Sequence, residues 1–196
     1  MTFGQLARGL NLFYSCRHDE RMTFGHVPAM STSPRRTMND APLTSIGFDP
    51  DDINTSEPTR TARLKWVVIV NDSIPAGRAV NAAICVASAT VADVRGLLGP
   101  AATDGAGTVH PGLPWAGCSV LVANTEVLRS IRLKGEAHEA IFVADMPTSA
   151  QDTRVYDDYL AAIGSTTPDT IEYLAVSLVG PKNRIDRIVG RLPLMP

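Results

Sequence analysis

The stretch Leu64–Asn71 reads LKWVVIVN, and it decides the fold. Its apolar, β-branched residues follow one another without alternation, which is typical of a strand buried on both faces. After a short loop, the Ala- and Val-rich stretch Arg78–Leu98 contains no helix breaker before Gly96. We therefore expect a helix of small residues packed closely on the strand, in an α/β domain that begins at about Arg63.

Three further strands and helices alternate through the rest of the chain. We expect strands at Cys118–Ala123, Glu139–Asp145 and Ile171–Val179, and helices at Thr125–Leu133, Ser149–Ile163 and Gly180–Val189. Repeated Pro and Gly residues predict a loop at 99–117. The alternation predicts a four-stranded mixed, mostly parallel sheet covered by helices, in which one antiparallel edge is common.

The first 62 residues differ from this domain. Five prolines interrupt them, and Ser, Thr, Asp and Asn fill the spaces between. Such a segment buries too little apolar surface to offset the entropy of ordering it, so we expect residues 1–62 to form a disordered extension. A short helix at 4–15 is a local exception, and the methionines at 22, 30 and 38 leave the true start codon open.

Composition restricts the classes of partner. The formal net charge is −2, so nucleic acid, which needs a basic face, is not an expected partner. The three cysteines (Cys16, Cys85 and Cys118) form no CxxC pattern, and the histidines show no metal spacing with them, so we expect no metal and no cofactor. Few cysteines favour the cytoplasm. No apolar run reaches the ~18 residues of a membrane helix, so no membrane partner is expected.

Two separated motifs resemble known families. Trp66–Cys85, WVVIVNDSIPAGRAVNAAIC, is similar to the opening of type 2 peptidyl-tRNA hydrolases, and Val179–Leu194 is similar to their ending. A closer resemblance is to the bacterial family called domain of unknown function 2000. Its Pro-x-Gly-x-x-x-Asn-Ala-Ala pattern occurs at Pro75–Ala83, and its Gly-Pro-Lys ending occurs at Gly180–Lys182. The resemblance implies a type 2 peptidyl-tRNA hydrolase-like α/β fold for residues 63–196.

The resemblance stops at the catalytic face of the hydrolases. Their pattern places Lys, Gln and His on one face of the first helix, and without a gap the matching residues here are Val80, Ile84 and Ala87. With one residue inserted in the loop, the matching residues are Asn81, Cys85 and Ser88. Neither register supplies a Lys or a His. Asp145 matches an acidic residue of that family, and Gly77–Arg78 keeps one glycine and one positive charge of its Gly-Lys turn.

The turn into the first helix is a candidate ligand site. A helix N-terminus presents unpaired N–H groups and partial positive charge, which suit an anion. The candidate ligand-binding residues are Asp72, Gly77, Arg78 and Asn81, with Arg78 able to bind phosphate or carboxylate at two points. The alternative is an ordinary turn with a solvated Arg78, in which Asn81 caps the helix or braces the loop.

The candidate catalytic residues are Asn81, Cys85 and Asp145. Cys85 follows Asn81 by one helical turn, but a catalytic Cys needs a His base, and a small core Cys is the alternative. Asp145 and Asp72 should both lie at carboxyl ends of strands, where two carboxylates can act as acid and base. Helix capping and loop solvation are the alternative for this pair.

Three functions remain open. The first is a binding module that holds a small anionic ligand or a peptide end over Gly77–Asn81, as a monomer or a homodimer. The second is a hydrolase of peptidyl-tRNA or another acylated substrate, which would use Asn81, Cys85 or Asp145. The third is a non-catalytic oligomeric scaffold.

Overall fold

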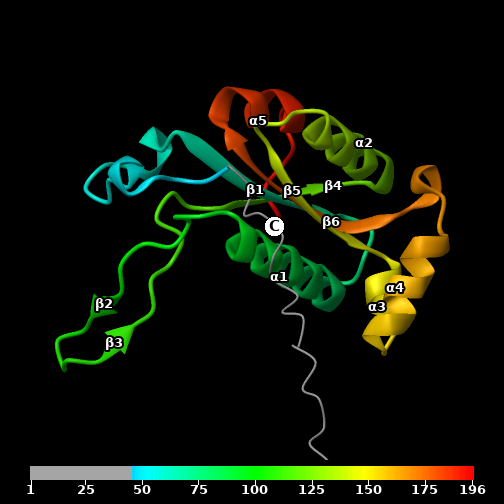
Figure 1. The fold of residues 1–196 in the computed structure, drawn as a ribbon, viewed down its shortest axis with the longest axis horizontal. Helices are drawn as coiled ribbons and strands as arrows, with labels where there is room; N and C mark the ends of the chain where they lie inside the picture. The colour runs from blue at the N-terminus through cyan, green and yellow to red at the C-terminus, as the bar shows by residue number, and fades with distance from the viewer. Residues whose placement is uncertain (1–45) are drawn as a thin grey trace, which may run out of the picture. The chain divides into compact units, whose positions relative to one another are not determined.

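The computed structural model describes residues 46–196 (Figure 1). Its centre is a four-stranded mixed sheet in the order β4–β1–β6–β5. In chain order the strands are β1 Leu64–Asn71, β4 Ser119–Ala123, β5 Phe142–Pro147 and β6 Tyr173–Pro181. The bounds of β1 are those predicted, and the other three strands begin one to three residues later than predicted. The predicted four-stranded mixed sheet is thus confirmed.

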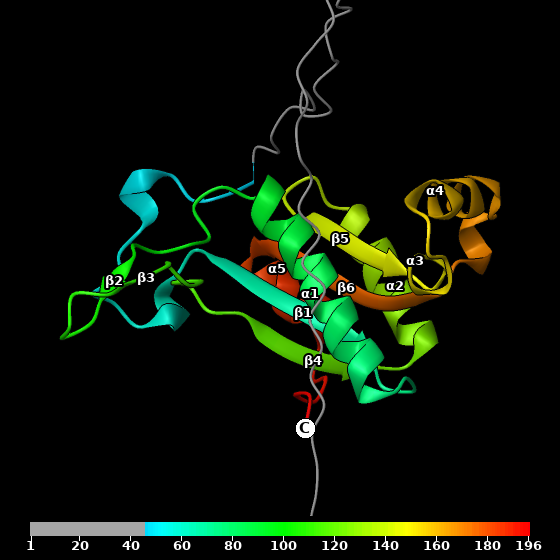
Figure 2. The ribbon, with the colours of Figure 1, turned by 90° about the horizontal axis from the view of Figure 1, so that it is seen from below.

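Helices cover both faces of the sheet (Figures 1 and 2). One face carries α1 and the other carries α2 and α5, with the bounds Ala76–Asp93, Thr125–Glu136 and Lys182–Val189. Trp66, Val68 and Val70 of β1 pack into the core under α1, whereas Val67 and Ile69 pack into the core under α2 and α5. Burial on both sides explains why β1 is apolar at successive positions.

We expected a mostly parallel sheet, and this is wrong, because two of the three strand pairs are antiparallel. β1 pairs with β4 in parallel, but β6 runs antiparallel to both β1 and β5, and it lies inside the sheet rather than at an edge. The reason is the connection before β6. α1 and α2 cross a face of the sheet and return the chain to its starting end, whereas α3 and α4 stay at one end of the sheet (Figure 1). The chain therefore re-enters the sheet from that end and must run backwards.

The single helix expected at 149–163 is two helices, α3 Ser149–Asp152 and α4 Tyr156–Ser165. Thr153 and Val155 between them have extended backbones, with φ, ψ of −98°, 150° and −110°, 131°. Both are β-branched, and such residues fit extended backbone better than helix. The break turns Arg154 and Val155 toward the end of β5, where they line a cavity described below.

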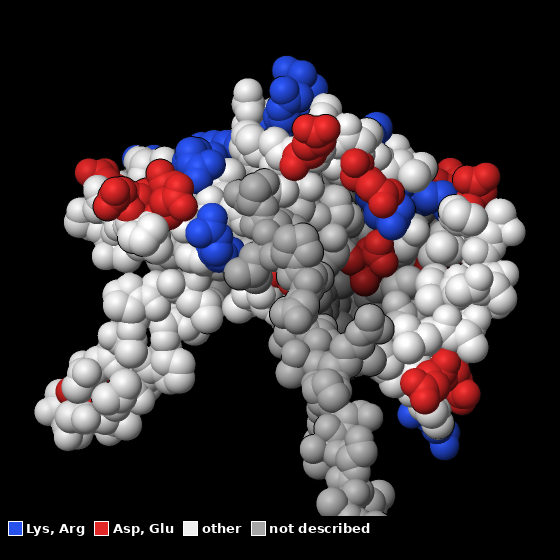
Figure 3. All heavy atoms as spheres, viewed as in Figure 1, with Lys and Arg blue, Asp and Glu red and all other residues white. Residues whose placement is uncertain are grey.

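The segment 99–117 is a protruding hairpin rather than a loop without strands. Two-residue strands, β2 Ala102–Thr103 and β3 Val109–His110, pair within it. It extends away from the sheet in both ribbon views (Figures 1 and 2). The hairpin contains no Lys, Arg or Glu, and its one Asp is Asp104. In the space-filling view it is therefore an almost uncharged arm (Figure 3).

The packed domain begins before Arg63, where the sequence placed its start. Phe48 is 3% exposed, and its ring lies 4.8 Å from that of Trp115. Arg63 holds this stretch through Gly47 O at 2.8 Å and Asp52 Oδ2 at 2.7 Å. The prediction of disorder thus fails for residues 46–62, and the rest of the predicted extension, with the helix at 4–15, lies outside the described residues. Within 46–196, no helix combines the length and apolar character needed to cross a membrane.

Candidate functional site

The turn into α1 holds the predicted ligand residues, and the structure ties two of them to α3. Gly77 is exposed, with open space around the position of a β-carbon. Arg78 Nε donates to Gln151 Oε1 at 2.6 Å, and its Nη2 lies 3.0 Å from Asp152 Oδ1. Gln151 Nε2 donates to Asn81 Oδ1 at 2.9 Å. Arg78 and Asn81 therefore brace α3 against α1, which is the loop-bracing role considered for Asn81.

A cavity of about 350 Å³ adjoins this brace, between α1, the end of β5 and the α3–α4 segment. It brings together the predicted catalytic residues Cys85 and Asp145, and we call it the Cys85–Asp145 cavity. The apolar part of its wall is Met146, Pro147, Ala150 and Val155. The remaining lining residues are polar or aromatic: Thr153, Arg154, Tyr156 and Tyr159. Its size and mixed lining suit a small molecule with an apolar part and a few polar groups.

The negative charge of Asp145 in this cavity is balanced by Arg132. Its Oδ2 accepts a hydrogen bond from Arg132 Nε at 2.8 Å, and the two side chains are only 22% and 25% exposed. Arg132 also pairs with Glu136 one helical turn later, and its guanidinium lies over the ring of Tyr173 at 5.4 Å. Because a guanidinium already pairs with this carboxylate, it repels an incoming anion less than a bare carboxylate would.

Tyr159 and Arg154 supply hydrogen-bond donors to the cavity. Burial, together with the nearby charge of Asp145 and with Tyr156, raises the pKa of Tyr159 above its ordinary value. The phenol therefore stays protonated at neutral pH. Arg154 forms no ion pair or hydrogen bond with the rest of residues 46–196, whereas Arg78 and Arg132 nearby are both paired. Arg154 is thus the cation that the cavity leaves open to a ligand.

Cys85 is exposed in the cavity, but no imidazole from residues 46–196 lines the cavity with it. Within the described part of the chain, His110 lies in the hairpin, 3.4 Å from Asp104, and His138 follows α2. Nucleophilic catalysis by a cysteine needs a nearby base to form the thiolate. The arrangement therefore fits binding better than the Cys–His chemistry considered from the sequence.

Cys118, the residue before β4, has a thiol with a shifted pKa. Burial raises its pKa from 9.0 to about 12. Although the residue is exposed at the surface, we expect its alkylation by iodoacetamide at pH 8 to be at least about tenfold slower in the native protein than in urea. Three pKa units cut the thiolate population by roughly 1,000-fold, and the higher nucleophilicity of the more basic thiolate recovers only part of that. Mass spectrometry of the Cys118 peptide over time measures both rates, and equal rates would show an unshifted thiol.

The two carboxylates considered as a pair do not meet. Asp145 is level with Val176 on β6, and Val176 is level with Ile69 on β1. Asp72 therefore lies two strands away, about 10 Å sideways, and three residues, about 10 Å, further along. Asp72 is exposed beyond β1. Residues 46–196 also contain no group of three His, Cys, Asp or Glu side chains placed to hold a metal ion.

Sequence reasoning missed Arg154, Tyr156 and Tyr159, which line the cavity, and Arg132, which pairs with Asp145. Tyr159 belonged to the single helix expected at 149–163, and the break at Thr153–Val155 instead turns this segment toward β5. Arg132 lies on α2 and reaches Asp145 because β5 follows α2 at the edge of the sheet. The sequence carried no signal for that strand order.

Comparisons with known proteins give matches to this domain. A solved structure titled as a protein of unknown function, Atu0240, from Agrobacterium tumefaciens strain C58, is similar to this chain with a TM-score of 0.63 and 22% sequence identity. The match covers 68% of this chain and 98% of that chain, so the two share a fold. No curated protein matches. A family model described as "Protein of unknown function (DUF2000)" matches residues 64–196. The chain belongs to this family.

Proposed function

We propose that the protein binds a small carboxylic acid with an apolar group, or the carboxyl end of a peptide, in the Cys85–Asp145 cavity. The observation that carries the proposal is Arg154, which lines the cavity and has no partner within the described residues. Guanidinium and carboxylate form two parallel hydrogen bonds, and these orient a ligand as well as hold it. We therefore propose the anion site in this cavity and not at the neighbouring Gly77–Asn81 turn, where the sequence suggested it.

The rest of the lining complements such a ligand. Met146, Pro147 and Val155 offer an apolar surface for a side chain or an acyl group. Asp145 is neutralised by Arg132, and the protonated phenol of Tyr159 can donate a hydrogen bond. The brace formed by Arg78 and Gln151 holds α3 in place, so the cavity is formed before the ligand arrives.

No imidazole of residues 46–196 lines the cavity beside Cys85, and Asp145 is already paired with Arg132, so we propose binding rather than hydrolysis. Our proposal keeps the resemblance to type 2 peptidyl-tRNA hydrolases, whose substrates are acylated, as support for an acyl- or peptide-bearing ligand. A cytoplasmic homodimer is the setting we propose for it. Val155 and Tyr156 at the cavity and Leu160 on α4 are exposed, and they form an apolar surface on which a second copy could pack.

Binding of N-acetyl-phenylalanine and of its primary amide tests this proposal. We expect the acid to raise the melting temperature of the protein and the amide, which lacks the charge, to leave it unchanged. Arg154→Ala should weaken binding of the acid by roughly 10- to 100-fold, because a hydrogen bond to a charged group contributes about 1.5–3 kcal/mol and 1.4 kcal/mol is a factor of ten. Isothermal titration calorimetry gives the dissociation constants.

Arg187→Ala is the matched control, since Arg187 is an exposed arginine on α5, on the opposite side of the sheet. It should bind the acid as the unaltered protein does. A peptide that ends in phenylalanine, compared with the free acetylated amino acid, distinguishes the two ligand sources. Equal affinity for acid and amide, or an unchanged affinity in Arg154→Ala, would refute the proposal. Release of an acyl group that stops in Cys85→Ser would instead assign a hydrolase.

A further inference from the structure

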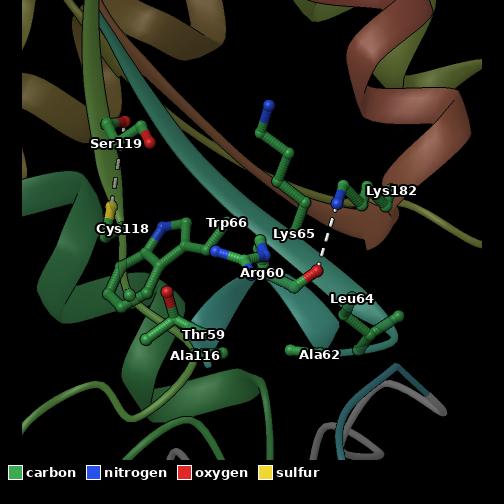
Figure 4. A pocket seen from close by; sticks show the side chains of 11 residues that line it. Thr59, Arg60, Ala62, Leu64, Lys65, Trp66, Ala116, Cys118, Ser119 and Lys182 are labelled. Atoms are coloured by element: carbon green, nitrogen blue, oxygen red, sulfur yellow. Dashed lines mark hydrogen bonds between the residues drawn. The ribbon is translucent and has the colours of Figure 1, made fainter. Parts of the chain in front are cut away.

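A second cavity, of about 380 Å³, lies at the other end of the sheet, against the beginning of β1 (Figure 4). β4 pairs with β1 only from Val67 onward, so the edge of β1 at Leu64–Trp66 is left open on that side. The stretch before β1, the start of β4 and the start of α5 close around this edge. The cavity is therefore built from three stretches that are distant in the sequence, and it shares no residue with the Cys85–Asp145 cavity.

The charged side chains that line this cavity are all basic: Arg60, Lys65 and Lys182. Arg60 precedes β1, Lys65 lies on β1 and Lys182 begins α5. Lys182 Nζ donates to the backbone oxygen of Arg60 at 3.1 Å, which holds the ammonium beside the cavity (Figure 4). Lys65 is paired with Asp186 at 2.6 Å, and the guanidinium of Arg60 has no partner within residues 46–196. Three cations against one nearby carboxylate leave the site positive.

The other lining groups neither oppose an anion nor occupy the space. Burial raises the pKa of the Cys118 thiol to about 12, so it stays neutral. Thr59 and Ser119 supply hydroxyl groups. Trp66 donates its indole N–H inward to Ser177 Oγ at 2.9 Å, and only 5% of the residue is exposed, so it offers the cavity an edge of its apolar ring. The lining thus combines positive charge, hydroxyl donors and an aromatic edge.

The start of α5 adds to the positive potential. Its N-cap residue Pro181 makes no side-chain capping hydrogen bond, and Lys182 is the first residue of this eight-residue helix. Free N–H groups at a helix N-terminus favour an anion. Gly180–Lys182 is also the Gly-Pro-Lys ending by which the chain resembles its family, and no role in the Cys85–Asp145 cavity accounts for it.

We propose that this second cavity binds the phosphate group of a small phosphorylated molecule, whose apolar part packs on Trp66. A phosphate monoester carries a charge of about −1.5 to −2 at pH 7 and several strong acceptor oxygens, which match cations that approach from different sides. A single carboxylate would leave part of this charge unmatched. Inorganic phosphate offers the same group without the apolar part.

Trp66 provides a direct readout of binding. The chain has two tryptophans, and Trp115 lies elsewhere, against Phe48. In a Trp115→Phe background, we expect phenyl phosphate to change the fluorescence of Trp66 in a saturable way, with an affinity that falls as salt is raised. Tighter binding of phenyl phosphate than of inorganic phosphate would identify an organic monoester as the ligand, and equal binding would identify phosphate itself.

Charge variants test the site. Arg60→Gln/Lys182→Gln should weaken phenyl phosphate binding at least 30-fold, whereas Asp186→Asn, which frees Lys65, should strengthen it by about three- to tenfold. Arg154→Ala, in the other cavity, is the control and should leave it unchanged, so that failure here is distinguishable from failure of the proposed function. Melting temperatures confirm that each variant is folded. No saturable fluorescence change at millimolar phenyl phosphate, or equal affinity in the double variant, would overturn the proposal.

Discussion

Replacing Ser177 by alanine should lower the free energy of unfolding by about 2–4 kcal/mol, because it breaks a buried relay of hydrogen bonds. Trp66 Nε1 donates to Ser177 Oγ at 2.9 Å, and Ser177 Oγ lies 2.7 Å from Thr90 Oγ1. Thr90 Oγ1 donates to Val86 O at 2.6 Å, so Ser177 must donate to Thr90. Ser177 and Thr90 are fully buried and Trp66 is nearly so. The substitution orphans the indole N–H in the core.

Chemical denaturation of three variants checks this relay. Thr90→Val keeps the shape of the side chain and leaves the indole satisfied, so its loss of stability should be smaller than that of Ser177→Ala. Ser88→Ala removes a hydroxyl that donates to Ile84 O at 2.8 Å on the exposed side of the same helix, and it should change stability by less than about 0.5 kcal/mol. Similar losses for Ser177→Ala and Ser88→Ala would show that the buried relay contributes nothing.

Gly180→Ala should also destabilise the protein, by about 1–3 kcal/mol, through overpacking. A β-carbon at Gly180 would lie 2.8 Å from Ile141 Cγ1 and 3.0 Å from Ala140 O. The second contact is with backbone, which cannot move aside cheaply. Packing of β6 against the segment before β5 therefore requires glycine here, and this gives a physical reason for the first residue of the Gly-Pro-Lys ending.

Gly77→Ala is the matched control for this glycine. Apart from its chain neighbours and the backbone of its own helix, nothing in residues 46–196 lies within 4 Å of its β-carbon position, and Gly77 is in the first turn of α1. Alanine there should be neutral or should stabilise the protein by up to about 1 kcal/mol, because it is a better helix former. Thermal and urea unfolding measure both variants. A loss at Gly77 as large as at Gly180 would contradict the packing argument.

The strands were predictable because their apolar runs are local features. LKWVVIVN predicts β1 at its observed bounds, because a short, unbroken run of apolar, β-branched residues suits a strand that is buried on both faces. The direction of β6 was not predictable, because it depends on whether the segment before it crosses the sheet. α3 and α4 stay at one end of the sheet. Their position there depends on how they pack against the rest of the domain, and their own sequence does not reveal it.

The candidate site was predictable in part for the same reason. Cys85 and Asp145 were named from helical spacing and from position at a strand end, and the structure places both in one cavity. Arg78 and Asn81 were predicted to bind a ligand, but both form hydrogen bonds with Gln151 of α3 instead. Their partner lies in a different element, so no local pattern reveals it.

A crystal structure of the complex with N-acetyl-phenylalanine tests the central claim most directly. We predict density for the ligand in the Cys85–Asp145 cavity, with its carboxylate paired to Arg154 and its phenyl ring against Met146 and Val155. Density at Arg60 and Lys182 instead, or an empty cavity in crystals soaked well above the dissociation constant measured in solution, would contradict it.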